Sequence, residues 1–253
     1  MPRRGAQASL TGAQWKTVIL ASLGGSLEFY DFILYGVFAQ YVAAAFFPAT
    51  ERLVSLILVF SVFGVGYLAR PIGGIVLSHF GDKYGRRKVF IGSLLVISAS
   101  TFAIGLLPGY ATWGVFAPLA LVGLRLVQGF CLGGELPGAI TYAVEAAPGS
   151  AGLACGVVFC FANTGVVLAT LTSLTLTSWL APADMVAWGW RLGFFCGGTT
   201  GFLSFWLQRS LEESPEFARL RQSATRRPFA EVLRDFRAPV ILGIRSEEHT
   251  SEL

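Results

Sequence analysis

The sequence predicts an all-α integral membrane protein in which six transmembrane helices form one bundle. Of its 253 residues, 54% are hydrophobic and 13% are charged, and the mean hydropathy is +0.62. Soluble domains usually carry about twice that charged fraction. Several apolar stretches reach the roughly 20 residues that a helix needs to cross a bilayer core about 30 Å thick. The net charge of +4 comes from basic residues between these stretches, which is typical of topology signals and not of a nucleic-acid surface.

Apolar segments define the expected bundle, which spans residues 17–209. We place its helices at 17–44, 53–78, 89–107, 113–141, 152–176 and 190–209. The short turn sequences at 48–52 and 108–112 indicate antiparallel neighbours, and a longer polar connection covers 177–191. The first segment is too long for a signal-peptide core and contains acidic residues, so we interpret it as a retained helix.

Lysine and arginine are concentrated in alternate connections. Residues 1–16, the loop after the second helix and residues 210–238 are rich in them, whereas the other connections hold only Arg52 and Arg191. The positive-inside rule therefore predicts a cytoplasmic N-terminus and a cytoplasmic central loop at 210–238. At the opposite interface we expect Arg191 to extend its charged end toward water. We also expect an aromatic belt there, formed by Trp179, Trp188 and Trp190.

The end of the sequence breaks this pattern. An apolar run at 239–244 is interrupted by RSEEHTSEL at 245–253. We expect 239–244 to be the start of a seventh helix and 245–253 to be non-native, so that the chain is a fragment.

Small residues recur at intervals of four in two of the expected helices. The positions are Gly129/Gly133, Gly134/Gly138 and Gly193/Gly197/Gly201. This spacing lets helix backbones approach closely. We therefore expect the fourth and sixth helices to be packed inside the bundle.

Charged residues inside the expected helices mark the candidate site: Glu28, Asp31, Arg70, Arg125 and Glu135. Such residues are costly in a bilayer and usually face a cavity or a partner. Helical spacing places Tyr35 on the face of the first two acids, and Gln128 and Glu135 on the face of Arg125. Either these charges only neutralise one another, or they form a substrate or proton site on the bundle axis.

Other chemistry is not indicated. The cysteines (Cys131, Cys155, Cys160 and Cys196) form no C-x-x-C motif, and the two histidines are isolated. GVGYLA at 64–69 matches a dinucleotide pattern but lies in mid-helix, and no phosphate-binding loop of the ATPase type is present. No nucleophile–base pair suggests an enzyme. We expect no cofactor and no metal, with a proton gradient as the energy source.

Two motifs, GDKYGRRK at 81–88 and RLVQGFCLGGE at 125–135, carry a family resemblance. The first is similar to the signature loop of the major facilitator superfamily, although Ser78 stands where the first glycine usually lies. RLVQGFCLGGE at 125–135 is similar to the fourth-helix motif, whose arginine corresponds to Arg125. Further stretches resemble the metabolite:proton symporters of that superfamily: LEFYDFILYG (27–36), ARPIGG (69–74), GGELPGAITYAVEAAP (133–148), WGWRLGFF (188–195) and LEESPEF (211–217).

The resemblance covers about residues 15–220 and implies the N-terminal half of a twelve-helix fold. It implies symport of a small organic acid or zwitterion with protons, by alternating access, across a bacterial inner (plasma) membrane. The partners would be the substrate, protons, the lipid bilayer and a C-terminal six-helix half. Substrates of such relatives include citrate, 2-oxoglutarate, shikimate and proline or betaine. An uncoupled facilitator of the same fold, for instance for sugars, stays open, as does a receptor or assembly subunit that transports nothing.

The resemblance also suggests residue roles. Asp31 is the expected proton-coupling carboxylate, with Glu28 second. The expected substrate-binding residues are Arg70, Arg125, Tyr35, Gln128, Glu135 and Asn163. For Asn163 an interhelical hydrogen bond is an equal alternative, and for Tyr35 packing with a polar tip is favoured. The expected gating residues are Gly81, Asp82, Lys83, Gly85, Arg86, Arg87 and Glu145. Where the family has a basic pair after Glu145, this chain has PGSAGLA (148–154), so the sequence offers that glutamate no obvious cationic partner.

Overall fold

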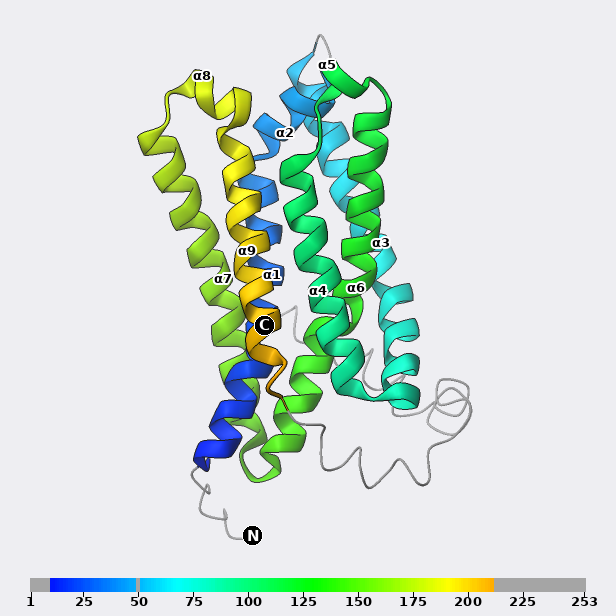
Figure 1. The fold of residues 1–253 in the computed structure, drawn as a ribbon, viewed down its shortest axis with the longest axis vertical. Coiled ribbons are helices and arrows are strands. Elements are labelled where there is room, and N and C mark those ends of the chain that lie inside the picture. The colour runs from blue at the N-terminus through cyan, green and yellow to red at the C-terminus, as the bar shows by residue number, and fades with distance from the viewer. Residues whose placement is uncertain (1–9, 49–50, 212–253) are drawn as a thin grey trace, which may run out of the picture.

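The computed structural model describes residues 10–48 and 51–211, and every regular element in these ranges is helical (Figure 1). The predicted seventh helix, the tail at 245–253 and nearly all of the central loop lie outside the described residues. The elements are α1 (Gly12–Val37), α2 (Ala39–Phe46), α3 (Arg52–Tyr84), α4 (Arg86–Leu106), α5 (Tyr110–Trp113), α6 (Phe116–Ala146), η1 (Pro148–Ser150), α7 (Ala151–Trp179), α8 (Pro182–Asp184), η2 (Met185–Gly189) and α9 (Trp190–Gln208).

Long helices run side by side along one axis and confirm the predicted all-α membrane bundle (Figure 1). By length and composition, α1, α3, α4, α6 and the helix at 148–179 can each cross a bilayer. The sixth expected span, α9, has 19 residues and is therefore about 28 Å long. It packs against α4 and α1, so it belongs to the same bundle.

The first span differs from its prediction at both ends. A capping box starts α1 at Gly12: the Gln14 amide N–H donates to Thr11 Oγ1, and the Thr11 N–H donates to the Gln14 side chain. The expected single helix to residue 44 is interrupted at Phe38, after which α2 continues. The fully buried ring of Phe38 anchors this interruption in the core.

The second span is longer than predicted, because α3 continues to Tyr84 instead of ending at 78. The signature sequence is therefore hardly a loop. Gly81, Asp82 and Lys83 form the last turn of α3, and Arg86 opens α4. Only Gly85 separates the two helices, with φ at +113°, a conformation that favours glycine.

The glycines of α6 allow a close helix contact, as their spacing predicted. A Cβ on Gly129 would overlap the carbonyl oxygen of Gly66, and a Cβ on Gly133 would overlap that of Arg70. From the other side, a Cβ on Gly73 would overlap the carbonyl oxygen of Phe130. The backbones of α3 and α6 therefore touch directly, which fixes the depth of Arg70 relative to α6.

The connection to α9 contains more helix than predicted, because α7 reaches Trp179 and is followed by α8 and η2. One expectation about this end was wrong, because Trp190 is fully buried against Phe46 and Phe194 and is not part of an interfacial belt. Arg191 is partly exposed, and its guanidinium donates to the carbonyl oxygens of Gly105 and Leu107 at the end of α4, at 2.8 and 2.5 Å.

Candidate functional site

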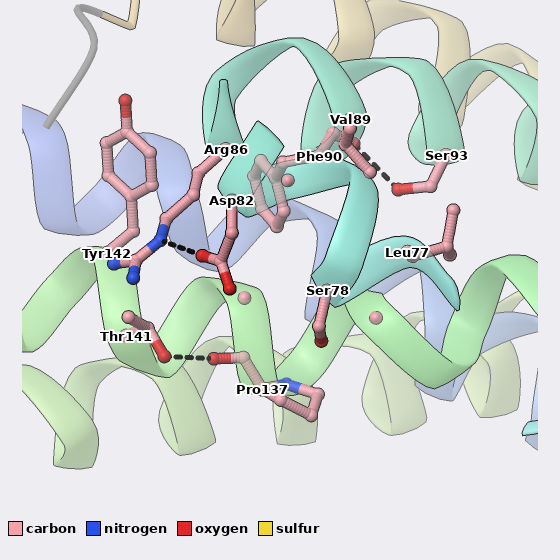
Figure 2. Close-up of a pocket in the computed structure, with 13 residues that line it drawn as sticks. Leu77, Ser78, Asp82, Arg86, Val89, Phe90, Ser93, Pro137, Thr141 and Tyr142 are labelled. Atoms are coloured by element: carbon pink, nitrogen blue, oxygen red, sulfur yellow. Dashed lines mark hydrogen bonds and ion pairs between the residues drawn. The ribbon is translucent and has the colours of Figure 1, made fainter. Parts of the chain in front are cut away.

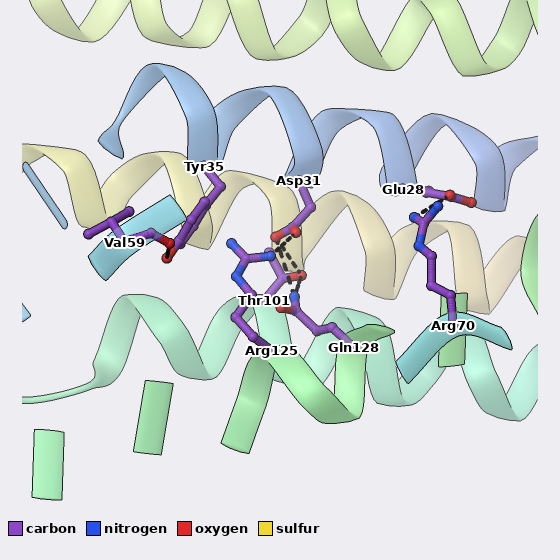
Figure 3. Close-up of polar contacts among 8 residues, drawn as sticks. All are labelled: Glu28, Asp31, Tyr35, Val59, Arg70, Thr101, Arg125 and Gln128. Atoms are coloured by element: carbon purple, nitrogen blue, oxygen red, sulfur yellow. Dashed lines mark hydrogen bonds and ion pairs between the residues drawn. The ribbon is translucent and has the colours of Figure 1, made fainter. Parts of the chain in front are cut away.

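An ion pair between Asp31 of α1 and Arg125 of α6 lies inside the bundle (Figure 3). Both residues are buried, with relative exposures of 2% and 4%. Gln128, one turn after Arg125, donates to Asp31 Oδ1 at 3.3 Å and to the Thr101 hydroxyl at 2.8 Å. Thr101 of α4 donates to the same carboxylate oxygen at 3.2 Å. The Asp31 carboxylate is thus held by groups from two other helices.

Tyr35 positions Arg125 through its ring. The guanidinium carbon lies 3.9 Å from the ring centroid, within the range of a cation–π contact. The Tyr35 hydroxyl donates to the carbonyl oxygen of Val59 at 3.1 Å (Figure 3). The Tyr35 side chain is fully buried. Its ring packs in the core and its hydroxyl bonds to the backbone, and Tyr35 does not line the cavity described below.

A second pair joins Glu28 of α1 to Arg70 of α3, with 2.6 Å between Glu28 Oε1 and Arg70 Nη2 (Figure 3). Glu28 is buried, whereas the Arg70 side chain is 22% exposed and stacks on the Tyr67 ring. A cavity of about 20 Å³ lies between the two ion pairs and is lined by all four charged residues. Its volume suffices for about one water molecule.

Protonation of Asp31 would change the surroundings of Arg125. A proton on Asp31 would leave Arg125 without its counter-ion in a buried place, which is costly. Arg125 already has two buried nitrogens, Nε and Nη2, without a hydrogen-bond partner among the described residues. An arginine in this state offers a planar fork to a carboxylate of another molecule. The geometry therefore allows protonation of Asp31 and binding of an anionic group at Arg125 to favour each other.

Two residues predicted with this site lie elsewhere. Glu135 is ten positions after Arg125, about 15 Å farther along α6, and it does not line the cavity between the ion pairs. Asn163 is exposed on α7, and its amide donates to the carbonyl oxygen of Phe159 one turn earlier. This bond stays within one helix, so the interhelical hydrogen bond expected of Asn163 is not present among the described residues.

A charged cluster occupies the end of the bundle where α3, α4 and α6 meet; we call this the charged end. Arg86 pairs with Asp82, at 3.3 Å between Nε and Oδ1, and also with Glu145 at the end of α6. The expectation that Glu145 lacks a cationic partner was wrong. No basic residue follows Glu145 closely in the sequence, but its partner lies 59 residues before it. A cavity of about 250 Å³ opens beside this cluster (Figure 2).

Other residues of the signature motif fix the helix ends. Arg87 donates to the carbonyl oxygen of Arg209 at 2.6 Å and so ties α4 to the end of α9. The Lys83 ammonium lies 5.2 Å from the centroid of the Tyr84 ring. Sequence reasoning missed Thr101 and Ser93, two buried hydroxyls of α4 that contact buried carboxylates. A hydroxyl in an apolar helix carries little signal, because most bond only to their own helix.

Comparison with known proteins assigns the family. The sugar (and other) transporter family matches residues 17–236. The chain belongs to this family of the major facilitator superfamily. It is therefore an integral membrane protein of a family of transporters, not of enzymes.

Relatives from several bacteria share more than a third of their matched residues with it. The chain is 39% identical to the citrate-proton symporter of Klebsiella pneumoniae over 94% of its own length and 54% of that protein. It is 36% identical to the proline/betaine transporter of Salmonella typhimurium, covering 80% of the chain and 41% of the relative. The chain thus spans about half the length of the curated relatives it matches.

The fold is also found in solved structures. The structure of a double tryptophan mutant of XylE superimposes with a TM-score of 0.75 at 17% identity, over 94% of this chain and 52% of that chain. XylE bound to 6-bromo-6-deoxy-D-glucose gives a TM-score of 0.74 over 82% of this chain and 46% of that chain. At this identity the likeness establishes the fold alone.

Proposed function

We propose that this chain is the N-terminal half of a symporter that moves a small organic acid or zwitterion together with protons. The observation that carries the proposal is the buried Asp31–Arg125 pair beside the Glu28–Arg70 pair. Charges inside a bilayer are retained where they serve a pathway. Asp31 is the proposed proton carrier, with Glu28 second, and Arg125 and Arg70 are the proposed partners of the substrate's negative charge.

The substrate class follows from the free hydrogen-bonding capacity at Arg125 and Gln128. Their unpartnered buried atoms are guanidinium nitrogens and an amide oxygen, which suit a carboxylate and an ammonium or hydroxyl group. A small organic acid or a zwitterionic amino acid derivative carries such groups. The names of the relatives, citrate-proton symporter and proline/betaine transporter, agree with this class.

The described bundle does not enclose a substrate. Ligand pockets usually measure roughly 300–1,000 Å³, whereas the cavity between the ion pairs holds about 20 Å³. We propose that a second six-helix half completes the site and that alternating access arises from rocking of the halves around it. Asp82, Arg86 and Glu145 would then hold one of the two arrangements, with the charged end in the cytoplasm of a bacterial cell.

The test is substrate uptake by inverted and right-side-out membrane vesicles. The vesicles contain the protein that the complete reading frame encodes. Labelled citrate and labelled proline or betaine serve as probes. We expect one of them to accumulate against its gradient when an inward proton gradient is imposed, because the proton supplies the driving force. A protonophore should reduce accumulation to the external concentration.

Two results would contradict the proposal. Uptake that equilibrates but never accumulates, and that ignores the protonophore, would indicate an uncoupled facilitator. Absence of uptake for organic acids, zwitterions and sugars, in vesicles where the protein is folded and inserted, would favour a membrane receptor or assembly subunit.

A further inference from the structure

Glu135 occupies a second polar site that the proposed substrate site does not use. The residue is fully buried between α1, α4 and α6. Its Oε2 lies 2.9 Å from the Ser93 hydroxyl, and its Oε1 has no hydrogen-bond partner in the described part of the chain. Gly24 of α1 makes room for it, because a Cβ at that position would overlap Oε1. The inference drawn from this site rests on the proposed function and extends it.

The charges around Glu135 do not stabilise an anion. The acids at positions 28 and 31 each contact an arginine, whereas no ion pair involves Glu135 among the described residues. The titratable group that acts on it is Glu28 of α1, and the Cys131 thiol lies one turn earlier on α6. From α4 the described contact is a neutral hydroxyl. A buried carboxylate without a counter-ion is costly as an anion.

The hydrogen bonds around Ser93 indicate where the proton lies. The Ser93 oxygen is within reach of two acceptors, Glu135 Oε2 at 2.9 Å and the carbonyl oxygen of Phe90 at 2.8 Å. A serine hydroxyl has one proton and can donate to only one of them. Both contacts are satisfied if Glu135 is protonated, since it then donates to Ser93 Oγ while Ser93 donates to the Phe90 carbonyl.

A route connects this site to the charged end. Ser93 lines the cavity of about 250 Å³ together with Asp82, Arg86 and Tyr142 (Figure 2). This volume holds several water molecules. The Ser93 hydroxyl therefore lies between a buried carboxyl group on one side and a cavity large enough for water on the other.

We propose that Glu135 is a proton-binding site that exchanges with the charged end through Ser93 and this cavity. For release, the Glu135 Oε2–H bond breaks and its proton passes to Ser93 Oγ. The Ser93 hydroxyl turns from the Phe90 carbonyl to a water molecule in the cavity and passes its own proton to that water, which leaves a carboxylate and a hydronium ion. Uptake is the reverse. Glu135 would thus add a second proton-binding residue to the proposed symporter.

The test is infrared spectroscopy of the full chain in lipid nanodiscs at neutral pH. We expect a carbonyl stretching band of a protonated carboxylic acid in the unmodified protein. Glu135→Gln should remove this band. The matched control Glu145→Gln should keep it, because Glu145 already forms an ion pair with Arg86. Ser93→Ala should keep the band, shift its frequency because one hydrogen bond is lost, and slow its exchange in D2O.

Absence of the band from the unmodified protein at neutral pH would overturn the inference. So would a band that survives Glu135→Gln in a protein with unchanged helical circular dichroism, or exchange that is as fast in Ser93→Ala. The measurement does not depend on transport. A protein with the band but no proton-driven uptake refutes only the proposed function, and the converse result refutes only the proton site.

Discussion

Arg191 shows how one side chain can fix two helices. Its guanidinium on α9 donates to two carbonyl oxygens at the C-terminus of α4, where the last carbonyls of a helix lack intrahelical partners. A cation is also favourable at this end of the helix dipole. Arg52 lies at the same end of the bundle, and in the described part of the chain its side chain bonds only to the exposed Gln40 side chain.

These two arginines give a matched prediction. Arg191→Gln should lower the free energy of unfolding by about 1–3 kcal/mol, because it removes charged hydrogen bonds from half-buried carbonyl groups. Arg52→Gln should change it by less than about 0.5 kcal/mol. The measurement is thermal unfolding in detergent, followed by circular dichroism. Equal shifts for the two variants would contradict the capping role.

The sequence predicted the direction of individual side chains better than it predicted their partners. The spacing of Glu28, Asp31 and Tyr35 placed them on one face correctly, because helical periodicity fixes the direction of a side chain. Partners on other helices were not predictable in this way. Arg86 meets Glu145, and Arg191 meets carbonyl groups 84 and 86 positions earlier, and no local pattern encodes such contacts.

The contact between α3 and α6 depends on positions without a side chain. Gly129 lies against the carbonyl oxygen of Gly66, whereas a Cβ on Gly123, on the same helix, would meet no atom within 4 Å. The two glycines therefore lie in the same helix but differ in how closely another backbone approaches them. Alanine is the better helix former by about 1 kcal/mol where space allows it.

We expect Gly129→Ala to destabilise the bundle by about 1–3 kcal/mol, since the backbones must move apart. Gly123→Ala should be neutral or stabilising by up to about 1 kcal/mol. Urea-dependent unfolding in mixed micelles measures both. If Gly129→Ala proved as stable as Gly123→Ala, direct backbone contact between α3 and α6 would be wrong.

The extent of each helix was harder to predict than its existence. Hydropathy detects the apolar part of a helix, and the predicted spans agree with the structure in these parts. It does not detect a polar extension beyond the bilayer. With 33 residues, α3 is about 50 Å long, well beyond a hydrocarbon core of about 30 Å, and its last turn carries the signature residues.

At the scale of the whole molecule, a small buried polar network lies within a mainly apolar interior, and apolar side chains also cover much of the outside. The buried acids, arginines and hydroxyls form their network among α1, α3, α4 and α6. Large apolar residues are exposed along α3, α6 and α7. This arrangement suits lipid and a second half as surroundings. The few charges in the apolar segments predicted this buried network, but the sequence did not show that Glu135 lies apart from the Asp31 site.

Proton flux coupled to substrate is the measurement that tests the central claim most directly. The complete protein is reconstituted in liposomes that contain a pH-sensitive dye, and substrate is added outside. We expect inward proton movement with the unmodified protein and none with Asp31→Asn, because an amide does not bind a proton in this pH range. The substitution still leaves a polar group beside Arg125. The matched control Glu51→Gln, at an exposed carboxylate before α3, should preserve the flux. Substrate-driven proton movement that persists in Asp31→Asn would contradict the account.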